Sequence, residues 1–140
     1  MAARQINVII AEDHSRVRKA VRNLLETAAE IRVVGEACNG EEAVDLVGTL
    51  SPDVLILDLE MPIMDGMEAM DFLRRQGCQI PILILSASNS HCHALALLAC
   101  GAHGYILKDE ASEFLVGAVR RAAQGKVVGA SPGVIKKRSQ

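Results

Sequence analysis

Four polar positions in this sequence each stand directly after a short apolar run. The acidic pair Glu12 and Asp13 follows the first run, Asp58 the second, Ser86 the third and Lys108 the fourth. In a parallel sheet the carboxyl ends of the strands lie along one edge, where open α/β folds place their ligands. We therefore expect these side chains, although scattered along the sequence, to meet at one site.

The residue types suit phosphoryl chemistry. A carboxylate such as Asp58 can attack a phosphoryl group and form an aspartyl phosphate, provided that the repulsion between the two anions is cancelled. Mg²⁺ can cancel it, because this ion prefers oxygen ligands and usually takes one or two protein carboxylates, which Glu12, Asp13 and Asp58 can supply. Lys108 offers a mobile positive charge for the phosphoryl oxygens, and Ser86 offers a hydroxyl hydrogen bond.

Each of these residues also has an ordinary interpretation. An acid after a strand is often a helix cap, a serine often forms a turn, and a lysine is usually solvated. These interpretations would have to coincide at four junctions, all at the same end of the strands. The shared site is therefore the stronger hypothesis.

The elements that must position these residues alternate along the chain. Short β-branched runs are separated by segments of helical periodicity, which predicts a doubly wound, five-stranded parallel sheet with helices on both faces. A loop that suits a site lies between Asp58 and the third helix, where Pro62 and Gly66 disfavour helix. The expected strands are residues 8–11, 31–37, 54–57, 82–85 and 104–107, and the second and last helices are residues 41–50 and 112–124.

Length and composition predict one domain without a membrane span. The chain has 140 residues, half of them hydrophobic, and no apolar stretch approaches the ~20 residues that a bilayer requires. The start of the chain lacks the apolar core of a secretory signal, and the four cysteines form no C-x-x-C pair, so we expect a cytoplasmic protein with reduced thiols. A net charge of −2 and 2% aromatic residues argue against direct DNA binding.

Residues 1–125 form the predicted domain, and residues 126–140 are expected to be a linker or tail. This tail contains Gly129, Pro132 and Gly133 and ends on the basic run 136–138. It is too short and too interrupted for a domain. The basic end is interpreted as a solvated terminus, with a phosphate-contacting arm as the alternative.

The chain from Ile6 to Gln124 resembles the receiver domain of bacterial two-component response regulators, the CheY-like, flavodoxin-like fold. The most specific part is residues 52–66, PDVLILDLEMPIMDG, with the acidic pair, Ser86 and Lys108 in the order and spacing of the family. The resemblance implies a phospho-accepting switch of a phosphorelay, to which a sensor histidine kinase or a small phosphodonor transfers its group. Such a domain accepts and later hydrolyses its own phosphoryl group and is otherwise not an enzyme.

The resemblance also assigns roles residue by residue. Asp58 is the phospho-acceptor, and Mg²⁺ is held by Asp13, Asp58 and the backbone carbonyl of Glu60, with Glu12 acting through a water. Lys108, Ser86 and the backbone amides of Glu60 and Ala87 bind the phosphoryl oxygens. Ser86 and Tyr105 are the switch residues, because in the family this hydroxyl moves toward the phosphate while the aromatic side chain turns inward.

Two stretches, residues 104–109 and 119–125, look like the NarL/LuxR-type regulators. In that subfamily the receiver precedes a helix-turn-helix domain, which implies transcription regulation through a DNA-binding output domain absent from this chain. Relatives of that subfamily often pair through the first and last helices, which makes a homodimer one interpretation of these helices and solvated charged faces the alternative; the charges concerned are Arg16, Arg22, Arg120 and Arg121. Asp109 follows Lys108 where many receivers have a proline, so we predict a trans peptide bond there.

Two other readings remain open at the level of sequence. A small aspartyl-phosphate phosphatase of the haloacid dehalogenase type would need D-x-D-x-T, whereas Asp58 is followed by Leu59 and Glu60. A stand-alone CheY-like interaction module is the other alternative. His14 is interpreted as the start of the first helix, with tuning of the site as the alternative, and the run 91–93, His-Cys-His, is interpreted as a helix end and not a metal site.

Overall fold

A single parallel sheet forms the centre of the molecule. The structure, a computed structural model, describes residues 4–134. The strands follow the order β2-β1-β3-β4-β5-β6, and all neighbouring pairs are parallel. The strands are β1 (Ile6–Ala11), β2 (Ile31–Ala37), β3 (Val54–Leu57), β4 (Ile82–Ser86), β5 (Gly104–Leu107) and β6 (Gly129–Ala130).

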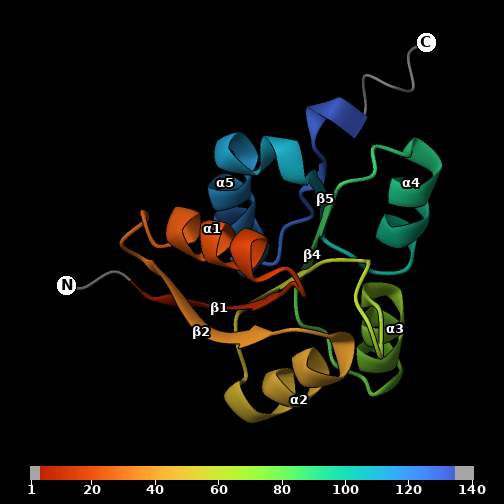
Figure 1. Ribbon diagram of the computed structural model, residues 1–140, viewed down its shortest axis with the longest axis horizontal. Coiled ribbons are helices and arrows are strands. Elements are labelled where there is room, and N and C mark those ends of the chain that lie inside the picture. The colour runs from red at the N-terminus through yellow and green to blue at the C-terminus, as the bar shows by residue number, and fades with distance from the viewer. Residues whose placement is uncertain (1–3, 135–140) are drawn as a thin grey trace.

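Helices cover both faces of the sheet (Figure 1). On one face lie α1 (Ser15–Leu25) and α5 (Ala111–Ala123), which follows the short 3₁₀ helix η1 (Lys108–Glu110). On the other face lie α2 (Gly40–Leu50), α3 (Gly66–Arg75) and α4 (His91–Ala99). The predicted doubly wound α/β fold is thereby confirmed.

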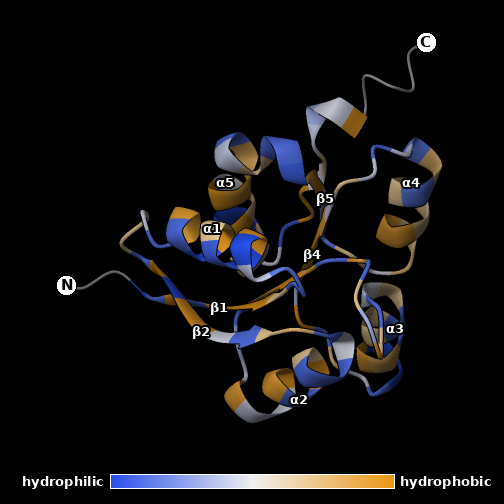
Figure 2. Cartoon of the chain, viewed as in Figure 1, coloured by the Kyte–Doolittle hydropathy of each residue, from blue (hydrophilic) through white to orange (hydrophobic). Residues whose placement is uncertain are grey.

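The central strands are apolar on both sides, as a sheet covered on both faces requires. Ile9, Leu55 and Ile82 pack toward α2, α3 and α4, whereas Val8 and Ile56 pack toward α1 and α5. Figure 2 shows hydrophobic central strands between helices that carry both hydrophobic and hydrophilic residues. Burial of these side chains on both faces fixes the register of the strands and therefore the places where they end.

Polar side chains fix the starts of several helices. Asn39 caps α2 by accepting from the Glu42 N–H at 2.9 Å, and Ser90 caps α4 by accepting from the His93 N–H at 3.2 Å. The helix α2 starts one residue before the predicted bound, and α5 covers 111–123 where 112–124 was predicted. These differences do not move any of the predicted site residues.

The expectation of five strands was wrong, because the sheet has six strands within residues 4–134. The sixth strand, β6, has only two residues, Gly129 and Ala130, neither of which favours a strand. Contacts distant in sequence hold it: the Ser131 N–H donates to the Tyr105 carbonyl at 2.9 Å, and the Leu107 N–H donates to Ser131 Oγ at 3.0 Å.

Part of the expected tail therefore lies on the sheet. The Val134 side chain is fully buried in the same cluster as Tyr105. The Gly133 N–H also donates to the Glu110 carboxylate at 3.0 Å. The basic run 136–138 lies outside the described residues, and the division at residue 125 into domain and linker stays a prediction.

Candidate functional site

The four polar positions singled out from the sequence meet at one edge of the sheet. β1 ends at Ala11 and β3 at Leu57, so Glu12 and Asp58 follow the carboxyl ends of adjacent strands. Ser86 is the last residue of β4, and Lys108 follows β5, the next strand in the sheet. Because all four strands are parallel, their side chains reach the same edge, as predicted.

Lys108 bridges two of the carboxylates. Its Nζ atom lies 2.7 Å from Glu12 Oε1 and 3.5 Å from Asp58 Oδ1. The Glu12 and Asp58 side chains are only 1% and 5% exposed, whereas that of Lys108 is 22% exposed. Two nearly buried anions thus share one cation that still reaches solvent.

This crowding separates the proton affinities of the two acids. Burial, together with the negative charge of Glu12, raises the pKa of Asp58 to about 6, although Lys108 opposes this rise. Burial would also raise the pKa of Glu12, but hydrogen bonds from Lys108 and from the His14 backbone outweigh burial and hold this pKa below its usual value. Burial would lower the pKa of Lys108, yet its contacts with Glu12 and Asp58 raise it. Asp58 is therefore the carboxylate that gains most from an additional cation.

Both acids of the pair, Glu12 and Asp13, contact His14. The His14 backbone N–H donates to Glu12 Oε2 at 3.1 Å, and the ring Nδ1 lies 3.2 Å from the same oxygen and 3.3 Å from Asp13 Oδ1. His14 is the N-cap residue of α1, as expected, but its side chain makes no capping hydrogen bond. The ring instead contacts both acids, so the interpretation of His14 as a helix start alone was incomplete.

The loop after β3 forms one wall of an open recess of about 510 Å³. Asp65 closes this loop with a capping box: its carboxylate accepts from the Glu68 N–H at 2.8 Å, while Glu68 Oε1 accepts from the Asp65 N–H at 3.0 Å. The recess is lined by Asp13, His14, Leu59, Glu60, Met61, Pro62 and Asp65. Asp13 and Glu60 thus line the same recess, and the family resemblance assigns the backbone of Glu60 to the cation.

Ser86 and Tyr105 are connected through one residue. The Ser88 N–H donates to Ser86 Oγ at 3.1 Å, and the Tyr105 hydroxyl donates to the Ser88 carbonyl at 2.7 Å. The Tyr105 side chain is fully buried and lies 6.5 Å from the His93 ring between ring centres. The structure therefore shows Tyr105 in an inward orientation.

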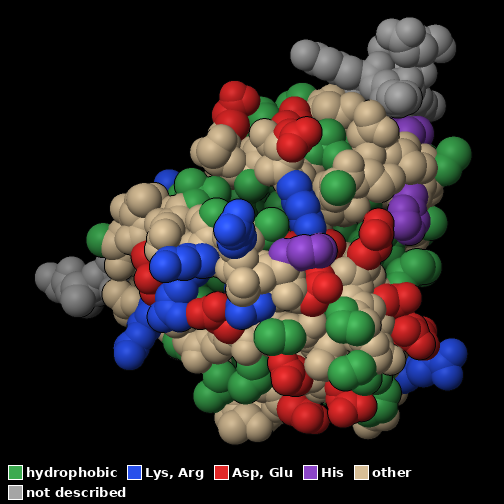
Figure 3. Space-filling model, in the orientation of Figure 1, with side chains coloured by type: hydrophobic (Ala, Val, Ile, Leu, Met, Phe, Trp, Pro, Cys, Tyr) green, Lys and Arg blue, Asp and Glu red, His purple; other side chains and the backbone are tan. Residues whose placement is uncertain are grey.

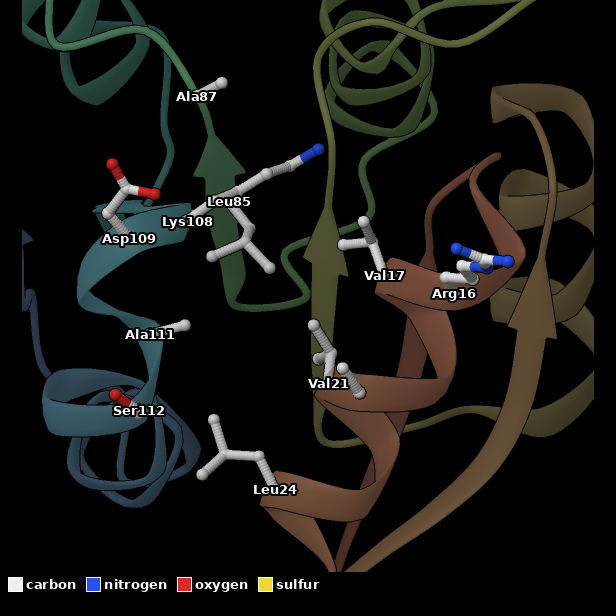
Figure 4. A pocket seen from close by; sticks show the side chains of 11 residues that line it. Arg16, Val17, Val21, Leu24, Leu85, Ala87, Lys108, Asp109, Ala111 and Ser112 are labelled. Atoms are coloured by element: carbon white, nitrogen blue, oxygen red, sulfur yellow. The ribbon is translucent and has the colours of Figure 1, made fainter.

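A second hollow, of about 610 Å³, lies between α1 and the start of α5 (Figure 4). Val17, Val21 and Leu24 of α1 form its apolar wall, and Ala87 and Lys108 stand at the end where the strands finish. Lys108 extends past the end of β4 and away from α5 in this view. The surface around α1 carries acidic, basic and histidine side chains together (Figure 3).

The donor set fits a divalent cation with oxygen ligands. Oδ1 of Asp13 is a buried carboxylate oxygen that accepts no hydrogen bond from the described residues. One oxygen of Asp13, one of Glu12 and a ring nitrogen of His14 lie within 4.8 Å of one another. Carboxylate oxygens at an open recess suit Mg²⁺, because this ion prefers oxygen ligands and keeps several waters.

Other expectations concern the surroundings of the site. No cis peptide bond occurs among residues 4–134, so the predicted trans bond between Lys108 and Asp109 is confirmed. His91 begins α4, as the helix-end interpretation of residues 91–93 required. In the part of the chain that the structure describes, no helix is both long enough and apolar enough to cross a membrane.

Comparison with known proteins identifies the class to which this site and fold belong. The response regulator receiver domain family matches residues 8–120, and the chain therefore belongs to that family. It is 40% identical over 121 residues to the nitrate/nitrite response regulator protein NarL of Escherichia coli strain K12, and 41% identical over 126 residues to NarP of the same strain. These alignments cover 86% and 90% of this chain, but 56% and 59% of the relatives. The chain thus spans little more than half their length.

Solved structures show the same fold. The signal receiver domain of the putative response regulator NarL from Mycobacterium tuberculosis superposes with a TM-score of 0.83 at 32% identity, over 89% of this chain and all of that one. A LuxR-family two-component response regulator from Aurantimonas gives a TM-score of 0.87 at 28% identity, over 97% and 99% of the two chains. The predicted family and its NarL/LuxR-type affinity are confirmed and are consistent with the predicted phosphorylation-dependent signalling switch. Neither alternative, the phosphatase or the stand-alone interaction module, is favoured.

Proposed function

We propose that Asp58 is the phospho-acceptor of this receiver domain. The observation that carries the proposal is the buried Asp58 carboxylate, which has a raised pKa and has Lys108 Nζ 3.5 Å from one oxygen. In the reaction an Asp58 oxygen forms a bond to phosphorus, while the bond from phosphorus to the donor breaks: the ring nitrogen of a phosphohistidine, or the acetate oxygen of acetyl phosphate. The donor leaves with the electron pair of that bond.

Mg²⁺ would be held by Asp13, Asp58 and the Glu60 carbonyl, with Glu12 nearby. When bound, it supplies positive charge against the phosphoryl oxygens. Receiver domains bind Mg²⁺ as a class, and the acidic cluster here supports the same role.

The chain's own groups complete the site. Lys108, whose side chain is 22% exposed, would turn from Asp58 to the new phosphoryl oxygens, which a point charge on a flexible stem can reach. The Ser86 hydroxyl and the backbone amides of Glu60 and Ala87 would hold the remaining oxygens. Turning Ser86 toward the phosphoryl group would remove the acceptor of the Ser88 N–H. The Ser88 contact to Tyr105 offers the route by which occupancy reaches α4 and β5.

The partners follow from the class of domain. A sensor histidine kinase is the proposed donor, and transcription control through a DNA-binding domain outside this chain is the proposed output. NarL and NarP are nitrate/nitrite response regulators that extend beyond the matched part, and both facts support this output. A homodimer through α1 and α5 also stays a proposal. Arg120 on α5 pairs with Glu30 at 2.7 Å, and Arg22 on α1 pairs with Glu26 and Glu36. These ion pairs lie within the chain, so the two arginines do not by themselves require a second copy.

The test is direct phosphorylation. Incubation with acetyl phosphate and Mg²⁺ is expected to add one phosphoryl group, detected by intact mass, and Asp58→Asn is expected to abolish it. The matched control is Asp65→Asn, because asparagine also caps a helix and Asp65 lines the same recess. This control should be phosphorylated like the wild type. An adduct that persists in Asp58→Asn would overturn the assignment.

A further inference from the structure

The His14 ring contacts the acidic pair, and helix capping does not explain these contacts. It is the N-cap residue of α1, yet its side chain makes no capping hydrogen bond. The ring is 71% exposed, but Nδ1 faces inward, 3.2 Å from Glu12 Oε2 and 3.3 Å from Asp13 Oδ1. Holding this orientation costs the side chain rotamer freedom, and the two carboxylate contacts offset that cost.

These separations match those between neighbouring ligands of one cation. With bonds of about 2.1 Å, adjacent ligand atoms of an octahedron lie about 3.0 Å apart. Nδ1 can donate a proton to the carboxylates, or it can give its lone pair to a cation that they share. The oxygen Asp13 Oδ1 is buried and accepts no hydrogen bond from the described residues, and the recess lined by His14 and Glu60 gives such a cation access.

We infer that His14 is a protein ligand of the divalent cation at the acidic pair, and that it extends the site from Mg²⁺ to first-row transition metals. The inference rests on the proposed cation site and adds its selectivity. Mg²⁺ favours carboxylate, carbonyl and water, and gains little from an imidazole. Ions such as Co²⁺, Ni²⁺ and Zn²⁺ accept an imidazole nitrogen readily. Glu12, Asp13 and His14 together therefore bind these ions more tightly than they bind Mg²⁺.

The experiment is a calorimetric titration of tag-free protein with NiCl₂ and, separately, with MgCl₂, without any phosphodonor. Oxygen ligands alone already favour Ni²⁺ over Mg²⁺, so the decisive quantity is the effect of a substitution on each ion. His14→Ala is expected to lower the affinity for Ni²⁺ at least about tenfold, and that for Mg²⁺ by less than about twofold. The matched control is His93→Ala, which removes an imidazole from the run His-Cys-His at residues 91–93 of α4. This variant should leave the affinities for both ions unchanged.

Four results would overturn the inference. If the wild type binds no Ni²⁺, or if His14→Ala binds Ni²⁺ as tightly as the wild type does, His14 is not a ligand. Equal losses for both ions would make His14 a structural support of the acidic pair. Loss of Ni²⁺ in His93→Ala would move the metal to α4. Because no phosphoryl group takes part, these outcomes are independent of the acetyl phosphate test that decides whether Asp58 is the acceptor.

Discussion

The Tyr105 hydroxyl donates a hydrogen bond of 2.7 Å to the Ser88 backbone carbonyl, and this contact joins the buried ring to the loop that carries Ser86. The ring itself is fully buried among α4 and β6 side chains. Packing and the hydrogen bond can therefore be separated by substitution. The packing should carry more of the stability, because the half-buried Ser88 carbonyl can take a water in place of the hydroxyl.

Tyr105→Phe is accordingly expected to lower the free energy of unfolding by about 1 kcal/mol. Tyr105→Ala should lower it by about 3 to 5 kcal/mol, because it leaves a cavity between the sheet and α4. Urea unfolding followed by circular dichroism measures both. Equal losses in the two variants would mean that the hydroxyl, and not the ring, holds the inward orientation.

The raised pKa of Asp58 predicts how stability depends on pH when EDTA keeps the protein free of metal. The folded pKa of about 6 lies above the ordinary value of 3.8, so the contribution of this group is complete below pH 3.8 and is lost as the pH rises through 6. Between pH 5 and 7 the wild type should lose on the order of 1 kcal/mol through Asp58. The lowered pKa of Glu12 acts below 4.5, outside this window.

Comparison with Asp58→Asn isolates this effect. The variant has no carboxyl group at the position, so between pH 5 and 7 the wild type should lose on the order of 1 kcal/mol of stability relative to the variant, whereas His103, whose lowered pKa makes stability rise with pH, acts alike in both proteins. Urea titrations at each pH measure the difference. Parallel curves for the two proteins would show that Asp58 titrates in the folded state as it does in the unfolded chain.

The sequence predicted the arrangement of the strand ends because that arrangement follows from topology. Once the apolar runs are parallel neighbours, Asp58 and Lys108 must reach the same edge. The sequence could not predict which carboxylate Lys108 contacts most closely, since Glu12 at 2.7 Å and Asp58 at 3.5 Å differ only in three-dimensional packing. It also gave no sign of β6, whose Gly-Ala strand is held by Ser131 and Val134 from outside it. The ring contacts of His14 were missed because a capping position explained the residue without its side chain.

The burial of Val134 tests whether the segment after α5 belongs to the folded domain. Val134→Ala removes two methyl groups from the cluster that contains Tyr105 and should lower the free energy of unfolding by about 1 to 3 kcal/mol. The control is Val127→Ala, where the side chain is 69% exposed and the change should stay within about 0.5 kcal/mol. Similar values for both would show that residues 129–134 do not hold the sheet in solution.

Ile63 is the most strained residue of the loop after β3. Its φ is 70°, in the left-handed region that β-branched residues avoid, and the Met64 N–H donates to the Pro62 carbonyl at 2.7 Å around it. The Ile63 side chain is 77% exposed, so side-chain packing does not offset the backbone strain. Ile63→Asn should raise the free energy of unfolding by about 1 kcal/mol, because asparagine tolerates this conformation.

The matched control for Ile63 is Ile63→Val, which keeps the branched Cβ and should change stability by less than about 0.5 kcal/mol. Urea unfolding of the three proteins gives the comparison. If Ile63→Asn unfolds at the same urea concentration as the wild type, the left-handed backbone there stores no strain.

Gly66 holds the acceptor loop at a distance that no larger residue allows. A Cβ atom at this position would collide with the backbone carbonyl oxygen of Asp58 and lie 3.0 Å from the Leu59 Cα, and backbone atoms cannot turn aside as a flexible side chain can. Gly66→Ala should therefore displace the loop. The change should lower the free energy of unfolding by about 2 to 3 kcal/mol and slow phosphorylation by acetyl phosphate.

The matched control for Gly66 is Gly117→Ala within α5, where a Cβ atom meets nothing within 4 Å. This control should raise the free energy of unfolding by up to about 1 kcal/mol. Urea unfolding and intact mass measure the two effects, and an unchanged phosphorylation rate in Gly66→Ala would show that the position of Asp58 does not depend on this close approach.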